Sequence, residues 1–134
     1  MAMVKIHGVK TTPEKTVRYV ANPEKTMDKY LIDGINCTRN EDTVIAKMKC
    51  YRKWYQSDRT HKNLSFHVIH AFSSKENISA EKAHEISMEW FRNNFPSDVL
   101  AIAATHNNTD SLHTHFVVNN ISLNGKGLSF DKTW

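Results

Sequence analysis

Short apolar segments separated by polar stretches mark the first third of the chain. Residues 4–9 alternate between apolar and polar side chains, which predicts a first β-strand. A helix is expected next, with Thr12 as its N-terminal cap and Pro13 in its first turn. This helix can run only to about Ala21, because the residue before a proline disfavours helical backbone. A short strand or turn should follow around residues 30–32.

Two longer amphipathic helices are expected further along. Residues 38–41 match a capping box in which Thr38 caps the helix and Glu41 reaches back. The apolar face of this helix comprises Val44, Ile45, Met48, Tyr51 and Tyr55. The second of these helices should begin near residue 80, after the cap Ser79, and end before a Phe-Pro pair. Its buried face should comprise Ala83, Ile86, Ser87, Trp90 and Phe91.

The remaining segments have the pattern of strands. Residues 64–72 place Leu64, Phe66, Val68, His70 and Phe72 on one face, and Ser65, His67, Ile69 and Ala71 on the other. Residues 99–105 and 112–123 are apolar runs joined by a polar link, which predicts an antiparallel hairpin. Asn124-Gly125 predicts a turn into a final short strand. The order of elements predicts an α+β fold, with a largely antiparallel central sheet flanked by helices.

Composition narrows the class of protein. A length of 134 residues with 40% hydrophobic side chains suits one domain with one core, so we expect a single domain over 1–134. The longest apolar runs, such as residues 99–104, are far shorter than the roughly 20 residues of a membrane span, and no membrane partner is expected. Two cysteines do not form a disulfide framework, which favours a reducing cytoplasm.

Positive charge is concentrated in the first half. Residues 1–67 hold 13 Lys and Arg against 7 Asp and Glu, net +6, whereas residues 68–134 hold 5 against 7, net −2. Such asymmetry favours contact with a polyanion, because neutralising phosphates is a large source of nucleic-acid affinity. A solvated helix face that only maintains solubility explains the same pattern equally well.

Three of the eight histidines have spacing suited to a metal ion. His113 and His115 leave the same face of one strand, with Thr114 pointing the other way. If the hairpin pairs residue 106 with 113, His106 lies beside them, at the ~4.5–5.5 Å Cβ spacing of cross-strand neighbours. Three imidazoles leave coordination positions open, as catalytic sites do. Histidines that serve only core packing are the alternative for this cluster. No metal role is assigned to His84 on a helix, His61 in a basic loop or His7 on an early strand, and of His67 and His70 at most one can approach the cluster.

Tyr19 is the tyrosine whose position suggests chemistry. Tyr51 and Tyr55 fit the apolar face of their helix, and Tyr30 is open to either interpretation. Tyr19 falls near the end of a short helix in the basic half of the chain. A phenol with a pKa of ~10 needs a cation or a general base to act as a nucleophile at neutral pH.

Two segments resemble a known family. Residues 19–26 (YVANPEKT) and 105–119 (THNNTDSLHTHFVVN) resemble the relaxase, or mobilisation nuclease, domain of conjugative plasmids and integrative elements, a single-tyrosine member of the HUH endonuclease superfamily. Residues 33–38, 66–72 and 83–86 resemble the intervening segments, in the same order. The resemblance implies a sandwich fold and an enzyme that nicks one DNA strand at a transfer origin. It implies a 5′-phosphotyrosyl intermediate and later religation.

The resemblance also implies roles for single residues. Tyr19 would be the nucleophile, His106, His113 and His115 the metal ligands, and Asp110 a catalytic carboxylate that orients a histidine or serves as base. The implied DNA contacts are Arg18, Asn22, Lys25, Thr26, Lys49, Arg52 and Lys53, with Trp54 available to stack on bases. The chain departs from the pattern at Thr114, where a hydrophobic residue is usual, and at Asn108, where many relatives have Asp.

The family implies partners and a metal as well. It suggests Mg²⁺ or Mn²⁺, whereas three imidazoles favour Mn²⁺, Ni²⁺ or Zn²⁺ over Mg²⁺. The expected partners are single-stranded and origin-of-transfer DNA, accessory relaxosome proteins and a coupling protein, in the bacterial cytoplasm. Relaxase domains usually form the N-terminal part of longer proteins, and the same is expected here.

Three alternatives stay open at this point. A non-catalytic single-stranded DNA-binding module would keep the fold without cleavage. A rolling-circle replication initiator or transposase would carry its tyrosine after the paired histidines, where this chain offers only Phe130 and Trp134. A zinc-dependent hydrolase of small substrates would need a nearby glutamate base, and no suitable one is evident in the sequence.

Overall fold

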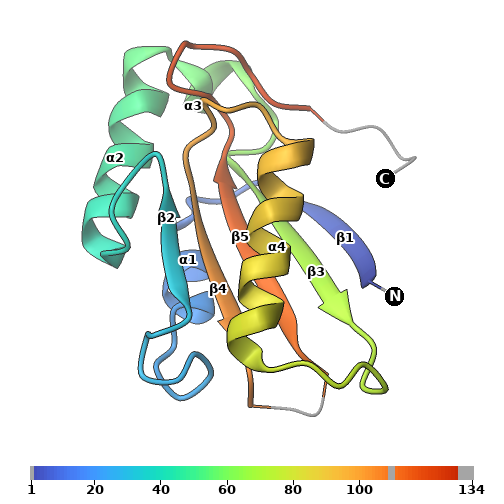
Figure 1. Cartoon of the computed structure of the whole chain (residues 1–134). Helices are drawn as coiled ribbons and strands as arrows, with labels where there is room; N and C mark the ends of the chain where they lie inside the picture. The colour runs from blue at the N-terminus through green and yellow to red at the C-terminus, as the bar shows by residue number, and fades with distance from the viewer. Residues whose placement is uncertain (1, 109–110, 130–134) are drawn as a thin grey trace.

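The computed structural model describes residues 2–108 and 111–129. In this part of the chain five strands form one sheet, whose arrangement can be followed in Figure 1. The elements in chain order are β1 (Ala2–Val9), α1 (Glu14–Val20), β2 (Ile32–Ile35), α2 (Glu41–Trp54), α3 (Ser57–Thr60), β3 (Ser65–Phe72), α4 (Ala80–Asn94), β4 (Ala101–His106) and β5 (His113–Asn119). The strand order is β1-β3-β5-β4-β2, and every neighbouring pair is antiparallel. The predicted α+β class with an antiparallel sheet is therefore confirmed.

The predicted hairpin of β4 and β5 is confirmed, and it has the register on which the grouping of the three histidines depended. His106 pairs with His113, and Ala104 pairs with His115. On the other side of β5, Ile69 of β3 pairs with His115. Side chains alternate between faces along a strand, so the three histidines of the hairpin project from one face at one end of the sheet.

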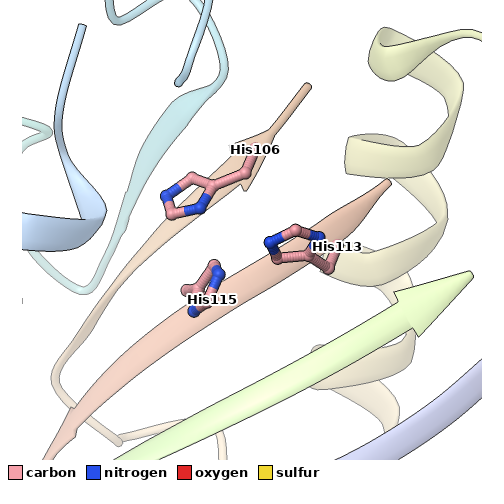
Figure 2. Close-up of side chains that lie close together, drawn as sticks. All are labelled: His106, His113 and His115. Atoms are coloured by element: carbon pink, nitrogen blue, oxygen red, sulfur yellow. The ribbon is translucent and has the colours of Figure 1, made fainter. Parts of the chain in front are cut away.

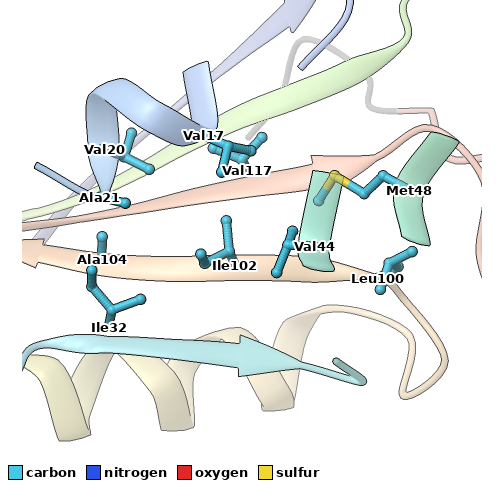
Figure 3. Packing of buried hydrophobic residues seen from close by; sticks show 10 residues of the cluster. All are labelled: Val17, Val20, Ala21, Ile32, Val44, Met48, Leu100, Ile102, Ala104 and Val117. Carbon is cyan, nitrogen blue, oxygen red and sulfur yellow. The ribbon is translucent and has the colours of Figure 1, made fainter. Parts of the chain in front are cut away.

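Helices cover both faces of the sheet, with α4 in front and α1 behind in Figure 1. Behind the sheet, α1 and α2 pack on β2, β4 and β5 (Figure 3), and the buried cluster there comprises Val17, Val20, Ala21, Ile32, Val44, Met48, Leu100, Ile102, Ala104 and Val117. The cluster beneath α4 comprises Phe66, Val68, Met88, Phe91, Phe95, Val99, Ala101, Ala103, Phe116 and Val118. On the α1 side of β1, Met3, Lys5 and His7 are exposed and Val9 is half-buried. The side of β1 that faces α1 is therefore not covered by a described helix, and this open surface lies on the same face of the sheet as the three histidines.

The caps of two helices differ from the prediction. The N-cap of α1 is Pro13, which makes no side-chain capping bond, so the assignment of Thr12 was wrong. The capping box at residues 38–41 was also wrong, because Asn40 caps α2 and accepts a 3.0 Å hydrogen bond from the Thr43 backbone N–H. Asparagine is a better cap than threonine, and its extended backbone here suits that position. The predicted cap Ser79 of α4 is confirmed by a 3.1 Å bond from the Lys82 N–H.

Other elements, and the buried face of α4, also differ from the prediction. The single turn α3 was not predicted, and the expected final strand is reduced, among the described residues, to one isolated bridge between Ile121 and Gly127. On α4, Met88 and His84 are buried, whereas Ile86 and Trp90 are only half-buried. None of the helices in the described part of the chain combines the length and apolarity that a membrane crossing requires.

Candidate active site

Three imidazole rings converge at the end of β4 and the start of β5 (Figure 2). One ring nitrogen from each of His106, His113 and His115 lies within 4.8 Å of the others, a spacing that can hold a metal ion. His106 and His115 are buried, whereas His113 is half-buried. The cluster is thus anchored in the protein on one side and open to a substrate on the other.

Two backbone carbonyls orient two of these rings. His106 Nε2 donates a 2.9 Å hydrogen bond to the carbonyl of Val20, the last residue of α1. His113 Nδ1 donates a 2.9 Å hydrogen bond to the carbonyl of Ser111. Because a carbonyl can only accept, the lone pair of each ring lies on its other nitrogen, His106 Nδ1 and His113 Nε2. Metal-ligating histidines typically use their second nitrogen in this way.

His115 presents a buried nitrogen that lacks a partner. Its Nδ1 lies 2.7 Å from Nε2 of His67, and its Nε2 is buried without a hydrogen-bond partner among the described residues. A polar atom left in this state is uncommon in a folded protein. Together with the free nitrogens of His106 and His113, it forms a donor set that could hold a metal ion, so the residues present fit a divalent ion.

Burial keeps the cluster in the form that binds metals. Burial lowers the pKa of His106 to about 4, although its bond to the Val20 carbonyl opposes the shift. Burial also lowers the pKa of His115 to about 2, with the neighbouring His106 and His67 adding to the effect. Both rings are therefore neutral at pH 7, and their lone pairs are available without the loss of a proton.

Tyr19 lies beside the histidines, on the last turn of α1. Its ring meets the rings of His106 and His115 edge-on, at centroid distances of 6.1 and 6.4 Å. Tyr19 is 52% exposed, so a large substrate can reach the residue. Lys25 Nζ lies 4.2 Å from the centroid of the Tyr19 ring, which places a cation directly beside the phenol. The structure therefore brings together Tyr19, Lys25 and the three histidines.

The loop after α1 is tied to the hairpin by its backbone. The Asn107 N–H donates to the Lys25 carbonyl at 2.8 Å, and the Thr105 N–H donates to the Leu31 carbonyl at 3.0 Å. Thr26 is fully buried and donates its hydroxyl to the Asn22 carbonyl at 2.8 Å. Asn22 accepts from the Glu24 N–H at 2.8 Å. Asn22 and Thr26 thus shape the loop that carries Lys25.

The other candidate DNA contacts are spread more widely. Arg18 is exposed on α1 and pairs with Asp42 at 2.7 Å. Lys49 and Lys53 are exposed near the end of α2. There α2 adjoins Asn119, whose side chain donates to the Met48 carbonyl, and Asn119 ends β5 while His113 begins it. Seven strand residues separate these ends by about 20 Å, so Lys49 and Lys53 do not share a site with the histidines.

Arg52 differs from its lysine neighbours. Its side chain is only 3% exposed and forms a 2.7 Å ion pair with Asp58. A second bond, of 3.0 Å, runs to the side-chain oxygen of the buried Asn119. Arg52 therefore connects α2, α3 and β5 inside the protein, and the structure does not present it to a ligand. Tyr55, expected in the core, is 38% exposed and stacks on Tyr51.

The remaining predictions concern Asp110, Asn108 and the two histidines of β3. Asp110 lies outside the described residues, and Asn108 is exposed, two residues beyond the end of β4. The sequence left open which of His67 and His70 approaches the cluster, and the structure identifies His67. His70 faces α4 and shares a 2.7 Å hydrogen bond with Ser87.

A polar chain behind the cluster was missed. Asp33 accepts a 2.6 Å hydrogen bond from His84, whose other nitrogen bonds to the hydroxyl of Thr105 at 2.6 Å. Thr105 in turn shares a 2.6 Å bond with Thr114. The sequence did contain a signal for these contacts. Side chains alternate along a strand, so Thr105 and Thr114 must point to the face of the sheet opposite the three histidines.

An antiparallel α+β domain with histidines converging beside an exposed tyrosine has the arrangement that the resemblance implied for a nuclease. Residues 19–134 match the family model described as "Relaxase: MobA/VirD2-like, nuclease domain". The chain therefore belongs to this relaxase family.

Two curated relatives illustrate the match. The chain is 28% identical over 126 residues to the group II intron-interrupted relaxase LtrB of Lactococcus lactis subsp. cremoris (strain MG1363), covering 78% of this chain and 22% of that protein. It is 29% identical over 123 residues to the protein rlx of Staphylococcus aureus, covering 92% of this chain and 34% of that protein. The chain thus spans between a fifth and about a third of the length of these relatives.

Proposed function

We propose that this relaxase domain nicks one DNA strand at a transfer origin through Tyr19 and later rejoins it during conjugative transfer. The observation that carries the proposal is the position of Tyr19, whose ring borders His106 and His115 while Lys25 lies 4.2 Å from its centre. Chain segments far apart in sequence meet at this point. Nothing in core packing requires the exposed tyrosine to be there.

The proposed step conserves the energy of the broken bond. The Tyr19 hydroxyl oxygen attacks the scissile phosphorus and forms a phosphotyrosyl bond to the 5′ side, while the bond to the 3′ oxygen breaks. The proton lost by the phenol balances the one gained by the released 3′ hydroxyl. Reversal by a 3′ hydroxyl reseals the strand and frees Tyr19. No nucleotide cofactor is needed, because one phosphodiester is exchanged for another.

The protein's own groups position the strand in this proposal. Lys25 offers a cation to the phosphate next to the phenol, on a loop held to the hairpin by Asn107. A divalent ion held by His106, His113 and His115 would act as a Lewis acid on the non-bridging oxygens of the phosphate. An all-imidazole donor set suits Mn²⁺, Zn²⁺ or Ni²⁺ better than Mg²⁺. Asp110 remains a proposed catalytic carboxylate.

DNA would then follow the basic half of the molecule. Arg18 and Lys25 lie near the reacting end, with Asn22 and Thr26 supporting the loop between them. Lys49, Lys53 and the 81%-exposed Trp54 would meet the substrate about 20 Å away, or about six nucleotides along a stacked strand. Trp54 offers a face on which a base can stack.

The wider setting is part of the same proposal. The domain over 1–134 would be the N-terminal nicking part of a longer protein, in line with the greater length of the matched relatives. Accessory relaxosome proteins and a coupling protein would deliver the nicked strand for transfer. A DNA substrate on a mobile element implies the bacterial cytoplasm.

The first test is a Tyr19→Phe variant incubated with labelled single-stranded origin oligonucleotides and Mn²⁺. The wild type should give a protease-sensitive DNA–protein band on a denaturing gel. Tyr19→Phe should lose this band by at least about 10³-fold while DNA affinity changes less than about threefold, because only the nucleophile is removed.

The matched control is Tyr30→Phe, which alters a 65%-exposed tyrosine on the adjoining loop and should keep the adduct. Cleavage by Tyr19→Phe would contradict the nucleophile assignment and indicate attack by water. Binding by the wild type without cleavage of any origin oligonucleotide would instead favour a DNA-binding module.

A further inference from the structure

One of the three ligand rings is held by a side chain instead of by the backbone. His106 and His113 donate to carbonyls, whereas His115 Nδ1 faces Nε2 of His67 at 2.7 Å. The two rings lie 4.9 Å apart between centroids, with an interplanar angle of 33°. His67 is half-buried on β3, and its backbone pairs with Val117, two residues beyond His115 on the same face of the sheet.

The direction of this hydrogen bond decides which nitrogen of His115 can bind a metal. His115 Nε2 is buried and unpartnered on the side of the cluster. If Nε2 carried the proton, a donor would be buried without an acceptor, which is unfavourable in a folded protein. If Nδ1 carries the proton, it donates to His67, and the Nε2 lone pair faces the other ligands. The second arrangement satisfies the donor, and it requires His67 to accept through Nε2.

We propose that His67 is a positioning residue of the metal centre, which accepts a hydrogen bond from His115 Nδ1 and thereby holds the His115 ring and its tautomer ready to coordinate through Nε2. The inference rests on the proposed metal-binding function of the cluster. It assigns to β3, a strand that carries no ligand, a part in building the site.

Geometry makes this role specific to His67. His7 lies directly across from His67 on β1, but it is exposed and is two strands away from β5. His70 is on the same strand as His67 but points to α4. His67 is thus the β3 histidine that can control His115, and its neighbours supply natural controls.

The test measures Co²⁺ binding to the chelator-treated protein by calorimetry and by the visible absorption spectrum of the bound ion. His67→Phe keeps an aromatic strand residue of similar size but removes the acceptor. It should weaken Co²⁺ binding by about 10–100-fold, the usual effect of losing a partner of a ligating histidine. His67→Gln retains an acceptor oxygen and should restore binding to within about threefold of the wild type.

The control is His7→Phe, which removes a nearby histidine without touching a ligand and should leave Co²⁺ affinity unchanged. Equal binding by the wild type and His67→Phe would overturn this inference and leave the metal centre intact. No Co²⁺ binding by the wild type would overturn the metal centre and the inference together. The circular dichroism spectrum and melting temperature of each variant verify that it is folded.

A second measurement needs no substitution. Long-range proton–nitrogen NMR spectra of the metal-free wild type should report His115 protonated at Nδ1 and bare at Nε2. His67 should have the same tautomer, with its bare Nε2 accepting. A His115 ring protonated at Nε2 would contradict the proposal, whatever the variants show.

Discussion

Arg52 and Lys53 are adjacent basic residues on α2 with different surroundings. The Arg52 guanidinium is buried between Asp58 and Asn119, whereas Lys53 is exposed. A helix turns by about 100° per residue, so neighbours in sequence face different environments. Their different exposure separates a structural cation from one available to a phosphate.

Arg52→Ala should therefore lower the free energy of unfolding by about 2–3 kcal/mol, because Asp58 and the buried Asn119 oxygen lose their donor. Lys53→Ala should change it by less than about 0.5 kcal/mol. The salt dependence of single-stranded DNA binding should change only for Lys53→Ala. Its slope of log affinity against log salt concentration should be smaller in magnitude by about 0.7. Urea unfolding and binding titrations at several salt concentrations check both. An Arg52→Ala protein that is fully stable, or that loses one unit of salt slope, would contradict this assignment.

The elements that carry the site are held by caps and by buried polar contacts. The Asn40 side chain satisfies a backbone N–H at the start of α2, while Glu41 pairs with Lys29 at 2.6 Å. On the α4 face, the hydrogen-bonded chain from His84 through Thr105 to Thr114 joins α4 to β4 and β5 at the register of the ligands. These contacts keep the strand ends aligned beneath His106 and His113.

Asn40→Ala should cost about 1 kcal/mol of stability, because the Thr43 N–H loses its acceptor. Thr38→Ala, two residues earlier, should cost only a few tenths, since its hydroxyl accepts one long 3.4 Å bond from the Asn40 N–H. Thermal unfolding of the two variants distinguishes them. A larger loss for Thr38→Ala would restore the capping box that the sequence suggested.

Across the whole molecule, neutral buried histidines couple the fold to pH. The pKa values of His106 and His115 are lowered to about 4 and about 2 by burial, whereas in the unfolded chain they return to ~6.5. Between these pH values the unfolded state binds more protons than the folded state. The contribution of the two histidines to stability is therefore fully present above pH 6.5 and is lost as the pH falls.

Metal-free protein should accordingly lose up to about 1.4 kcal/mol of unfolding free energy per pH unit for each of these two histidines between pH 6.5 and pH 5. Denaturant unfolding in the presence of a chelator measures the slope. His115→Gln should reduce the slope by up to about 1.4 kcal/mol per pH unit, and the remaining slope should come from His106 and from His67 and His70, whose pKa values burial also lowers. The exposed His7→Asn should leave the slope as in the wild type. A pH-independent free energy over this interval would contradict the assignment of neutral buried rings.

Local sequence patterns alone predicted most of the helices and strands and the pairing of two of the histidines on one face. Apolar periodicity located the main helices and strands, and the two-residue spacing of His113 and His115 placed them on one face. The short polar link predicted the hairpin, and the structure shows the register that brings His106 opposite His113. These features depend on residues close together in the chain, where side-chain period and turn length define the geometry. Tyr19 was found through resemblance of its segment to relaxases.

Only the tertiary structure decided which distant groups meet. The Val20 carbonyl and His106 are 86 positions apart, and His67 and His115 are 48 apart, so no local pattern specifies their hydrogen bonds. Charge along α2 suggested that Arg52 faces a phosphate, whereas packing of α2 against α3 and β5 buries it. Burial and long-range pairing arise when separate elements pack together, and they set the protonation and orientation of the site.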